Sequence, residues 1–336
     1  MTDRYSRQIL FHGIGGEGQR RLGNSCAVII GCGALGTVIA TSLVRAGVGK
    51  VRIIDRDFIE YHNLQRQALF DEDDIRNQLP KAIAAERHLK KVNSSIEIEG
   101  IVADVNHTNI EKFVHDADII LDGLDNLETR FLINDVSLKH KIPWVYGGAI
   151  SASGMTMNII PGQTPCLRCF HPEVPSEARI HTCETAGVIA PAPFIIGSLQ
   201  VAEALKILVG AEKINRHLIV INVWTGKFRH FEVGRRTDCV ACQGKYEFLE
   251  GKYGTRTTSL CGQNAVQVIS PEIKEISLEK LATQLGLIGE VSYNEFMLRS
   301  TVDGHEIVIF PDGRAIVENT DDESLARGLY AKYIGV

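Results

Sequence analysis

Three glycines, Gly31, Gly33 and Gly36, form a pattern in this 336-residue chain that suggests a definite chemistry. They follow a short apolar run, residues 26–30, and precede a stretch with helical periodicity, residues 37–46. Glycines in a turn of this kind let the backbone approach a phosphate closely, and the N-terminus of the following helix favours negative charge. The spacing therefore predicts a nucleotide-binding loop between a strand and a helix.

An acid at the end of the next apolar run indicates a residue that would bind a ribose. That run, residues 50–55, ends in Asp55, and in dinucleotide-binding folds an acid at this place hydrogen-bonds a ribose hydroxyl. The glycine loop and Asp55 alone favour an NAD-dependent oxidoreductase as the first interpretation. They do not separate such an enzyme from others that bind nucleotides.

Charged side chains gather downstream of that acid, and hydride transfer has little need of them. Asp57 and the polar stretch 62–67, with Arg66, follow the second predicted strand; Lys81 opens a predicted helix, and Asp125 follows a later strand. Arginine and lysine offset charge on phosphates and a carboxylate holds Mg²⁺, as nucleotidyl transfer requires. The alternative is that Arg66 and Lys81 are solvated surface charges and that Asp125 caps a helix.

Four cysteines in two CxxC pairs suggest a metal. The pairs, Cys166 with Cys169 and Cys239 with Cys242, lie far apart in the sequence and in turn-prone contexts. Four thiolates are the number that a tetrahedral structural zinc takes, with no position left open for catalysis. Two redox-active dithiols and unliganded cysteines are the alternatives.

The elements that must position these residues alternate between strand and helix. This alternation predicts an α/β fold with a doubly wound, mainly parallel, Rossmann-like sheet. We expect a nucleotide domain over residues 1–248 and a small α+β domain over 259–336, joined by a linker within 244–258. Residues 161–193 read as a long irregular loop, and helical periodicity returns over 195–209.

The bulk properties exclude several classes of function. A net charge of -5 argues against general affinity for nucleic acid. No apolar run reaches the length of a membrane span, and the N-terminal residues lack the apolar core of a signal peptide. We therefore expect a cytoplasmic protein, with neither a nucleic acid nor a membrane as its partner.

The order of the motifs is more specific than any one of them. Over about the first three quarters of the chain, the sequence resembles the ThiF/MoeB/HesA family, relatives of the ubiquitin-activating enzymes. The matching stretches are residues 4–8, 31–36, 55–67, 80–81, 122–126 with Thr129 and Arg130, 147–148, 182–188 and both CxxC pairs.

The resemblance implies ATP-dependent adenylylation of the C-terminal Gly-Gly carboxylate of a ubiquitin-like sulfur carrier. ATP, Mg²⁺ and Zn²⁺ are the implied cofactors, a homodimer is the implied assembly, and a cysteine desulfurase or another protein is the implied sulfur donor. The implied nucleotide-site residues are Gly31, Gly33, Ala34, Gly36, Asp55, Asp57, His62, Asn63, Leu64, Gln65, Arg66, Lys81, Asp125 and Asn126.

Within that set, the resemblance implies separate roles. Asp55 would bind the ribose, and Asn63, Arg66 and Lys81 would contact the phosphates. Asp125 would hold Mg²⁺. Two further residues have implied catalytic roles: Arg7, which would reach into the site of a partner subunit, and Cys183, which is either a sulfur-relay thiol or a structural cysteine.

The identity of the carrier stays open at this level. A ThiS-type carrier of thiazole synthesis is favoured over a MoaD-type carrier of molybdopterin synthesis. A non-catalytic binder of ubiquitin-like proteins would need a damaged nucleotide site, yet every polar residue expected there is present.

Overall fold

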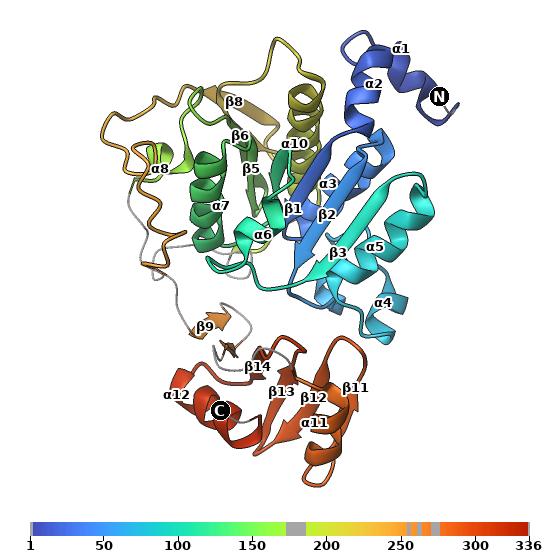
Figure 1. Cartoon of the computed structure of the whole chain (residues 1–336), viewed down its shortest axis with the longest axis vertical. Helices are drawn as coiled ribbons and strands as arrows, with labels where there is room; N and C mark the ends of the chain where they lie inside the picture. Colours follow the sequence, from blue (N-terminus) through green and yellow to red (C-terminus); the bar gives the residue numbers. More distant parts are fainter. Residues whose placement is uncertain (1–2, 173–185, 254–256, 261–263, 270–275, 335–336) are drawn as a thin grey trace. The chain divides into compact units, whose positions relative to one another are not determined.

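The computed structural model describes residues 3–172, 186–253, 257–260, 264–269 and 276–334. The chain divides into two compact units, Met1–Tyr253 and Gly254–Val336. The first unit contains an eight-stranded sheet and the second a six-stranded sheet (Figure 1).

The eight-stranded sheet has the order β3-β2-β1-β4-β5-β6-β7-β8. Strands β3 to β5 in this order run parallel, whereas β6, β7 and β8 each pair antiparallel with their neighbours. This confirms the predicted doubly wound, mainly parallel fold. The strands are β1 (Cys26–Ile30), β2 (Lys50–Asp55), β3 (Glu97–Val102), β4 (Ile119–Asp122), β5 (Trp144–Ile150), β6 (Ser153–Ile159), β7 (Leu218–Asn222) and β8 (Lys227–Phe231).

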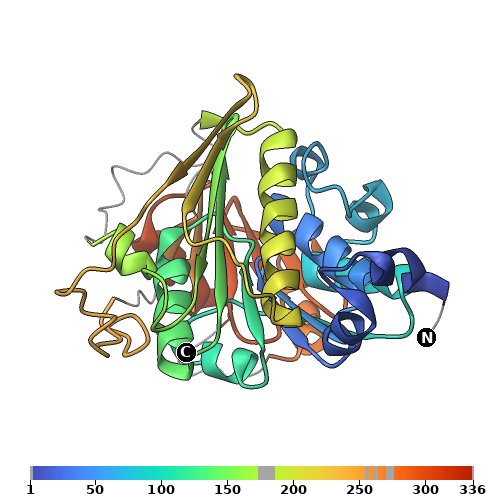
Figure 2. The same ribbon diagram turned by 90° about the horizontal axis from the view of Figure 1, so that it is seen from above.

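Helices cover both faces of this sheet, so its central strands are buried and read as continuous apolar runs. In Figure 2, α10 (yellow-green) lies along one face and α7 (green) along the other; α3 and α5 share the face of α10. The helices of this unit are η1 (Asp3–Tyr5), α1 (Ser6–Leu10), α2 (Gly15–Gly23), α3 (Ala34–Ala46), η2 (Tyr61–Asn63), α4 (Glu72–Arg76), α5 (Lys81–Val92), α6 (Ile110–Val114), α7 (Leu127–His140), α8 (Leu167–Phe170) and α10 (Pro191–Val209).

Helix α10 is the long apolar helix of the core. Among the described residues, it alone is long and apolar enough to cross a membrane by length and composition. The sequence prediction that no apolar run reaches the length of a membrane span was therefore wrong for this segment. In this structure it packs on α3, β5 and β6. Gly197 permits the close approach to α3, because a Cβ there would lie 3.0 Å from Val38.

Two sequence predictions about connecting segments were wrong in part. The irregular loop predicted over 161–193 contains α8, and α10 begins at Pro191, since proline suits the first helical turn. The predicted linker over 244–258 begins too early. Phe248 and Leu249 are buried, and their backbone N–H groups both donate to the carboxylate of Asp135 on α7.

The second unit is a six-stranded sheet of order β11-β12-β13-β14-β10-β9, antiparallel throughout. A hairpin turn at residues 311–313 joins β13 to β14, and the side chain of Asp322 caps the last helix by accepting from the N–H groups of Ser324 and Leu325. Its elements are β9 (Thr257–Leu260), β10 (Ala265–Val268), α11 (Leu278–Leu285), β11 (Val291–Tyr293), β12 (Leu298–Val302), β13 (His305–Ile309), β14 (Ala315–Glu318) and α12 (Glu323–Tyr333).

Candidate functional site

The glycine loop connects β1 to α3 in the predicted way. Gly31 has a φ of +91°, and a Cβ on Gly36 would lie 2.0 Å from the carbonyl oxygen of Gly31. Both positions therefore require glycine. Gly33 precedes α3, which begins at Ala34, and a Cβ on Gly33 would meet no atom closer than 3.8 Å. The loop thus leaves open space at the N-terminus of a 13-residue helix, where phosphate binds well.

Asp55 at the end of β2 holds this loop in place. Its carboxylate accepts a hydrogen bond of 2.6 Å from the backbone N–H of Cys32 and one of 2.7 Å from that of Asp57. Burial raises the pKa of Asp55, although Lys81 nearby opposes the shift. The acid at this position therefore fixes the backbone on which a nucleotide would rest.

Lys81 is a buried cation rather than a solvated one. It begins α5, is only 7% exposed, and places its Nζ 3.0 Å from Oδ2 of Asp57. Burial disfavours the charged form, but the negative charges of Asp57 and Asp55 outweigh it and raise the pKa of Lys81. The alternative of a surface charge is wrong for this residue.

A second ion pair lies beside the first, and the sequence analysis did not find it. Arg56 binds Asp104, which follows β3, at 2.8 Å, and approaches Asp57 at 3.6 Å. Burial opposes the charge, yet Asp104, Asp57 and Asp125 raise the pKa of Arg56. Asp104 stands in no recognisable sequence motif. It meets Arg56 only because β2 and β3 are neighbours in the sheet, so the pair could not be predicted from the sequence.

Asp125 follows β4 in an exposed position. Its charge contributes to the raised pKa of both Lys81 and Arg56, so it belongs to the same group. With the other residues that the structure describes, Asp125 makes no hydrogen bond or ion pair. The cap of α7 is Asn126, whose side chain accepts from the N–H of Thr129 at 2.9 Å. The alternative that Asp125 caps this helix is therefore wrong.

The polar stretch after Asp57 forms a short turn around η2. Asn63 is buried, and its Oδ1 accepts the N–H of Glu60 at 3.2 Å. Arg66 donates to the carbonyl of His62 at 2.8 Å, so its guanidinium has a neutral partner that it can exchange for a phosphate. Gln67, buried to 3% exposure, lies against Gly33 and was not among the predicted site residues.

Four other residues predicted for the site are His62, Leu64, Arg7 and Cys183. His62 is exposed and lies 3.4 Å from Glu60, and Leu64 is half-buried. Arg7 is exposed on α1 and makes no hydrogen bond or ion pair within the described part of the chain. Cys183 lies outside the described residues.

The two CxxC pairs meet, although they are far apart in sequence. The Sγ atom of Cys166 lies 3.8 Å from Cys169, 3.6 Å from Cys239 and 3.5 Å from Cys242, and Cys169 lies 3.7 Å from Cys242. Thiolates in a tetrahedron around zinc, each about 2.3 Å from the ion, stand about 3.8 Å apart, whereas a disulfide requires about 2.0 Å. Cys166 does precede a helix, α8, so the prediction of turns on both sides of the site was wrong in part. The four-sulfur geometry still fits a metal.

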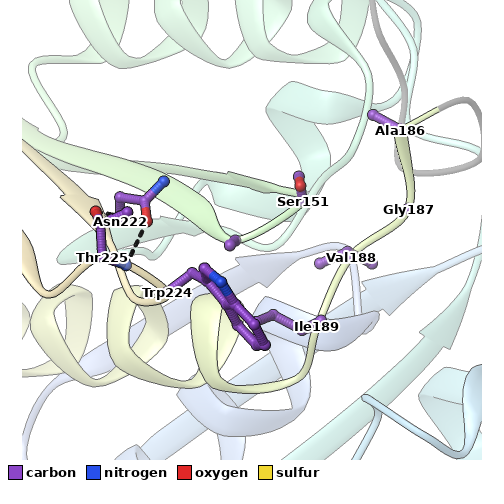
Figure 3. Close-up of a pocket in the computed structure, with 9 residues that line it drawn as sticks. Ser151, Ala186, Gly187, Val188, Ile189, Asn222, Trp224 and Thr225 are labelled. Carbon is purple, nitrogen blue, oxygen red and sulfur yellow. Dashed lines mark hydrogen bonds between the residues drawn. The ribbon is translucent and has the colours of Figure 1, made fainter.

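A cavity of about 410 Å³ opens at the end of β5, on the edge of the sheet where the glycine loop lies. The backbone of Ser151 binds the lining segment 187–189, because its N–H donates to the carbonyl of Gly187 and its carbonyl accepts from the N–H of Ile189. Trp224 and Ile189 both line this cavity (Figure 3), and Trp224 is 81% exposed. The lining residues are Ser151, Ala152, Ala186, Gly187, Val188, Ile189, Asn222, Trp224 and Thr225.

This cavity is connected to the η2 turn. The side-chain amide of Gln65 reaches the carbonyl of Val188 at 3.5 Å. Neither the cavity nor Trp224 could be predicted from the sequence, because the residues that line the cavity come from three separate connections.

Together, the open glycine loop and the charges at the same sheet edge define an α/β nucleotide-binding protein of the doubly wound class. The chain belongs to the ThiF family, which it matches over residues 5–241.

The relatives and solved structures agree with this assignment. The chain is 43% identical to the "Sulfur carrier protein ThiS adenylyltransferase" of Bacillus subtilis, over 100% of both chains. It is 34% identical to the "Sulfur carrier protein adenylyltransferase" of Thermus thermophilus, over 71% of this chain and 90% of that one. A crystal structure of E. coli MccB with ATP aligns with a TM-score of 0.62 at 27% identity, covering 72% of this chain and 75% of that one.

Proposed function

We propose that this chain uses ATP to adenylylate the C-terminal carboxylate of a ubiquitin-like sulfur-carrier protein, with release of pyrophosphate. The observation that carries the proposal is the group of Lys81, Arg56, Asp57 and Asp125 beside an open glycine loop. The names of the relatives from Bacillus and Thermus support the same activity.

The chemistry needs charge stabilisation more than proton transfer. A carboxylate is already ionised at neutral pH, so it can attack the α-phosphorus of ATP without a general base. Negative charge then grows on the departing pyrophosphate. Lys81 and Arg66 are the cations that would meet it, by exchanging Asp57 and the His62 carbonyl for phosphate oxygens.

The nucleotide would be held mainly by backbone. The glycine loop and the first turn of α3, with Gly31, Gly33, Ala34 and Gly36, would receive the phosphates. Asp55 has oxygen lone pairs left beyond its two backbone hydrogen bonds, and these would accept the ribose hydroxyls. Asn63 would orient the η2 turn toward the phosphates.

Asp125 fits a magnesium ligand, because it is a carboxylate with no hydrogen bond or ion pair among the described residues. A bound Mg²⁺ would offset charge on the phosphates.

The four cysteines of the two CxxC pairs fit a structural zinc site. We expect one zinc per chain by elemental analysis, and loss of that zinc with reduced thermal stability in Cys239→Ser. A zinc-free protein that keeps its full stability would refute the metal assignment.

A ThiS-type carrier is favoured because the Bacillus relative, which carries that name, matches both units of this chain. A MoaD-type carrier is the alternative. The carrier tail would enter through the cavity at Trp224 and run along β5 past Gly147 and Gly148. A separate sulfur donor, such as a cysteine desulfurase, would then act on the adenylate, with Cys183 as a candidate relay.

A second copy of the chain would complete the site. Arg7 lies beside Leu10 and Phe11, which are 74% and 57% exposed. An exposed apolar surface next to Arg7, which makes no ion pair within the described part of the chain, suits a homodimer in which Arg7 reaches the partner's nucleotide.

Pyrophosphate release tests the proposal directly. Purified protein with Mg-ATP receives either a ThiS-type or a MoaD-type carrier, and each carrier is also supplied without its terminal glycine. We expect release with one intact carrier and none with the truncated forms. If neither intact carrier gives release from folded protein, the proposal is wrong.

A further inference from the structure

Arg130 on α7 contacts one carboxylate and two backbone carbonyls at the charged edge of the sheet. Its Nε donates to Oδ2 of Asp122 at 2.9 Å, and its Nη2 donates to the carbonyls of Leu124 at 2.5 Å and Gly147 at 2.8 Å. Both Arg130 and Asp122 are buried. A single guanidinium therefore joins the end of β4, the loop before Asp125, and the middle of β5.

The surrounding residues reinforce this junction. The other oxygen of Asp122 accepts the N–H of Leu124 at 2.9 Å. Gln200 on α10 donates to the carbonyls of Asp122 and Val145, at 2.9 and 3.1 Å. A Cβ on Gly147 would collide with Gln200 at 2.4 Å, so glycine is needed there for α10 to reach the strand.

The position of Asp125 depends on this network, because its own side chain has no hydrogen-bond partner among the described residues. It follows Leu124 directly, and Leu124 is held at both its N–H and its carbonyl by the pair of Asp122 and Arg130. The same guanidinium also fixes Gly147, next to which the carrier tail is proposed to run.

We infer that Arg130 is a positioning residue, which sets the distance between the Asp125 loop and β5 and so aligns the two reactants. This inference rests on the proposed function. Adenylylation needs the carboxylate and the α-phosphorus in contact with correct orientation, and a displacement of about 1 Å costs on the order of 100-fold in rate. Lysine cannot replace the arginine, since an ammonium group lacks the planar fork that spans separate acceptors.

Arg52 on β2 supplies a matched control. It is also a buried arginine, and its Nη1 donates to the carbonyl of Phe113 and to Asp116, both at 2.6 Å. These contacts lie at the opposite end of the sheet, before β4 begins. Replacing either arginine by lysine should reduce stability in a similar way, whereas only the change at Arg130 should disturb the site.

The experiment compares Arg130→Lys with Arg52→Lys in the full chain. Calorimetry measures the affinity for ATP with EDTA and with Mg²⁺, and a second assay measures carrier-dependent pyrophosphate release. For Arg130→Lys we expect at least a fivefold loss of the Mg²⁺-dependent gain in ATP affinity and at least a tenfold lower rate. ATP affinity in EDTA should stay within twofold, and Arg52→Lys should keep both properties.

The outcomes separate the two proposals. If both variants keep the Mg²⁺-dependent gain and the rate, or lose them equally, Arg130 is only structural and the inference is wrong. If the wild type binds Mg-ATP but releases no pyrophosphate with either carrier, the proposed function fails while the calorimetry still tests Arg130. Should Arg130→Lys not fold, Asp122→Asn weakens the same pair at constant shape and carries the same expectation.

Discussion

The two ends of the eight-stranded sheet carry similar charges but use them differently. At the amino end, Lys50 and Arg52 meet Glu97, Glu99 and Asp116, and every one of these carboxylates lies within 4 Å of a cation. At the carboxyl end, one group comprises Arg56, Lys81, Asp57, Asp104 and Asp125. Asp55 and the buried pair of Asp122 and Arg130 lie at the same end of the sheet.

The two ends of the sheet differ in whether every carboxylate of the charged group has a cation within ion-pairing distance. At the carboxyl end, Asp125 makes no ion pair within the described residues, while Lys81 is buried deeply enough that its charge is weakly screened by water. A network that satisfies all its charges stabilises the fold. One that leaves a carboxylate unmatched beside a buried cation and an open glycine loop is arranged to receive a further charged group.

The strongest test of this contrast is removal of the unmatched carboxylate. For Asp125→Ala we expect carrier-dependent pyrophosphate release to fall on the order of 10²–10³-fold, the usual loss for one charge-stabilising contact. The free energy of unfolding should change by less than about 0.5 kcal/mol, because the side chain is exposed and makes no hydrogen bond or ion pair with the residues that the structure describes. Asp116→Ala is the control, with activity kept and stability reduced. The contrast fails if the two variants show the reverse pattern.

The buried lysine provides the next largest effect. Lys81→Met should lower the free energy of unfolding by about 1–3 kcal/mol, because it removes the buried cation that lies beside Asp55 and Asp57. Lys50→Met should cost less than about 1 kcal/mol, as expected for an ion pair near the surface. Urea denaturation measures both. Equal losses would show that burial does not distinguish the two ends.

The smallest effect is a pH dependence at the amino end. The hydrogen bond from Arg52 lowers the pKa of Asp116 from 3.8 to about 2. A carboxyl with a lower pKa in the folded state contributes stability above its unfolded pKa and loses it as the pH falls through the folded value. The difference in unfolding free energy between wild type and Asp116→Asn should therefore be full at pH 6 and shrink between about pH 4 and pH 2. Urea titrations at several pH values measure it, and a gap that widens on acidification would contradict the assignment.

Sequence alone was sufficient for the elements whose signal is local. The glycine loop, the helix that opens at Lys81 and the two CxxC pairs depend on neighbours a few residues away, so their spacing predicted them. Asp55 and Asp125 were located by their place after predicted strands, since parallel strands end at one edge of a sheet.

Residues whose role comes from strand neighbours could not be found in this way. Arg130 gains its contact with Gly147 only when β4 lies beside β5, and Asp104 meets Arg56 only when β2 lies beside β3. Phe248 is a residue whose sequence context gave a wrong prediction. It stands in a polar, glycine-containing stretch that suggested a linker, yet it packs against Phe131 on α7 with ring centroids 4.9 Å apart.

Helix α10 has a consequence for the synthesis of the chain. As an isolated peptide, this 19-residue apolar segment is long enough to engage the machinery that sorts nascent membrane proteins. Its packing partners α3, β5 and β6 all precede it in sequence, and they leave the ribosome first. The segments that cover α10 are therefore already synthesised when it emerges, so α10 can pack against them without waiting for a later part of the chain.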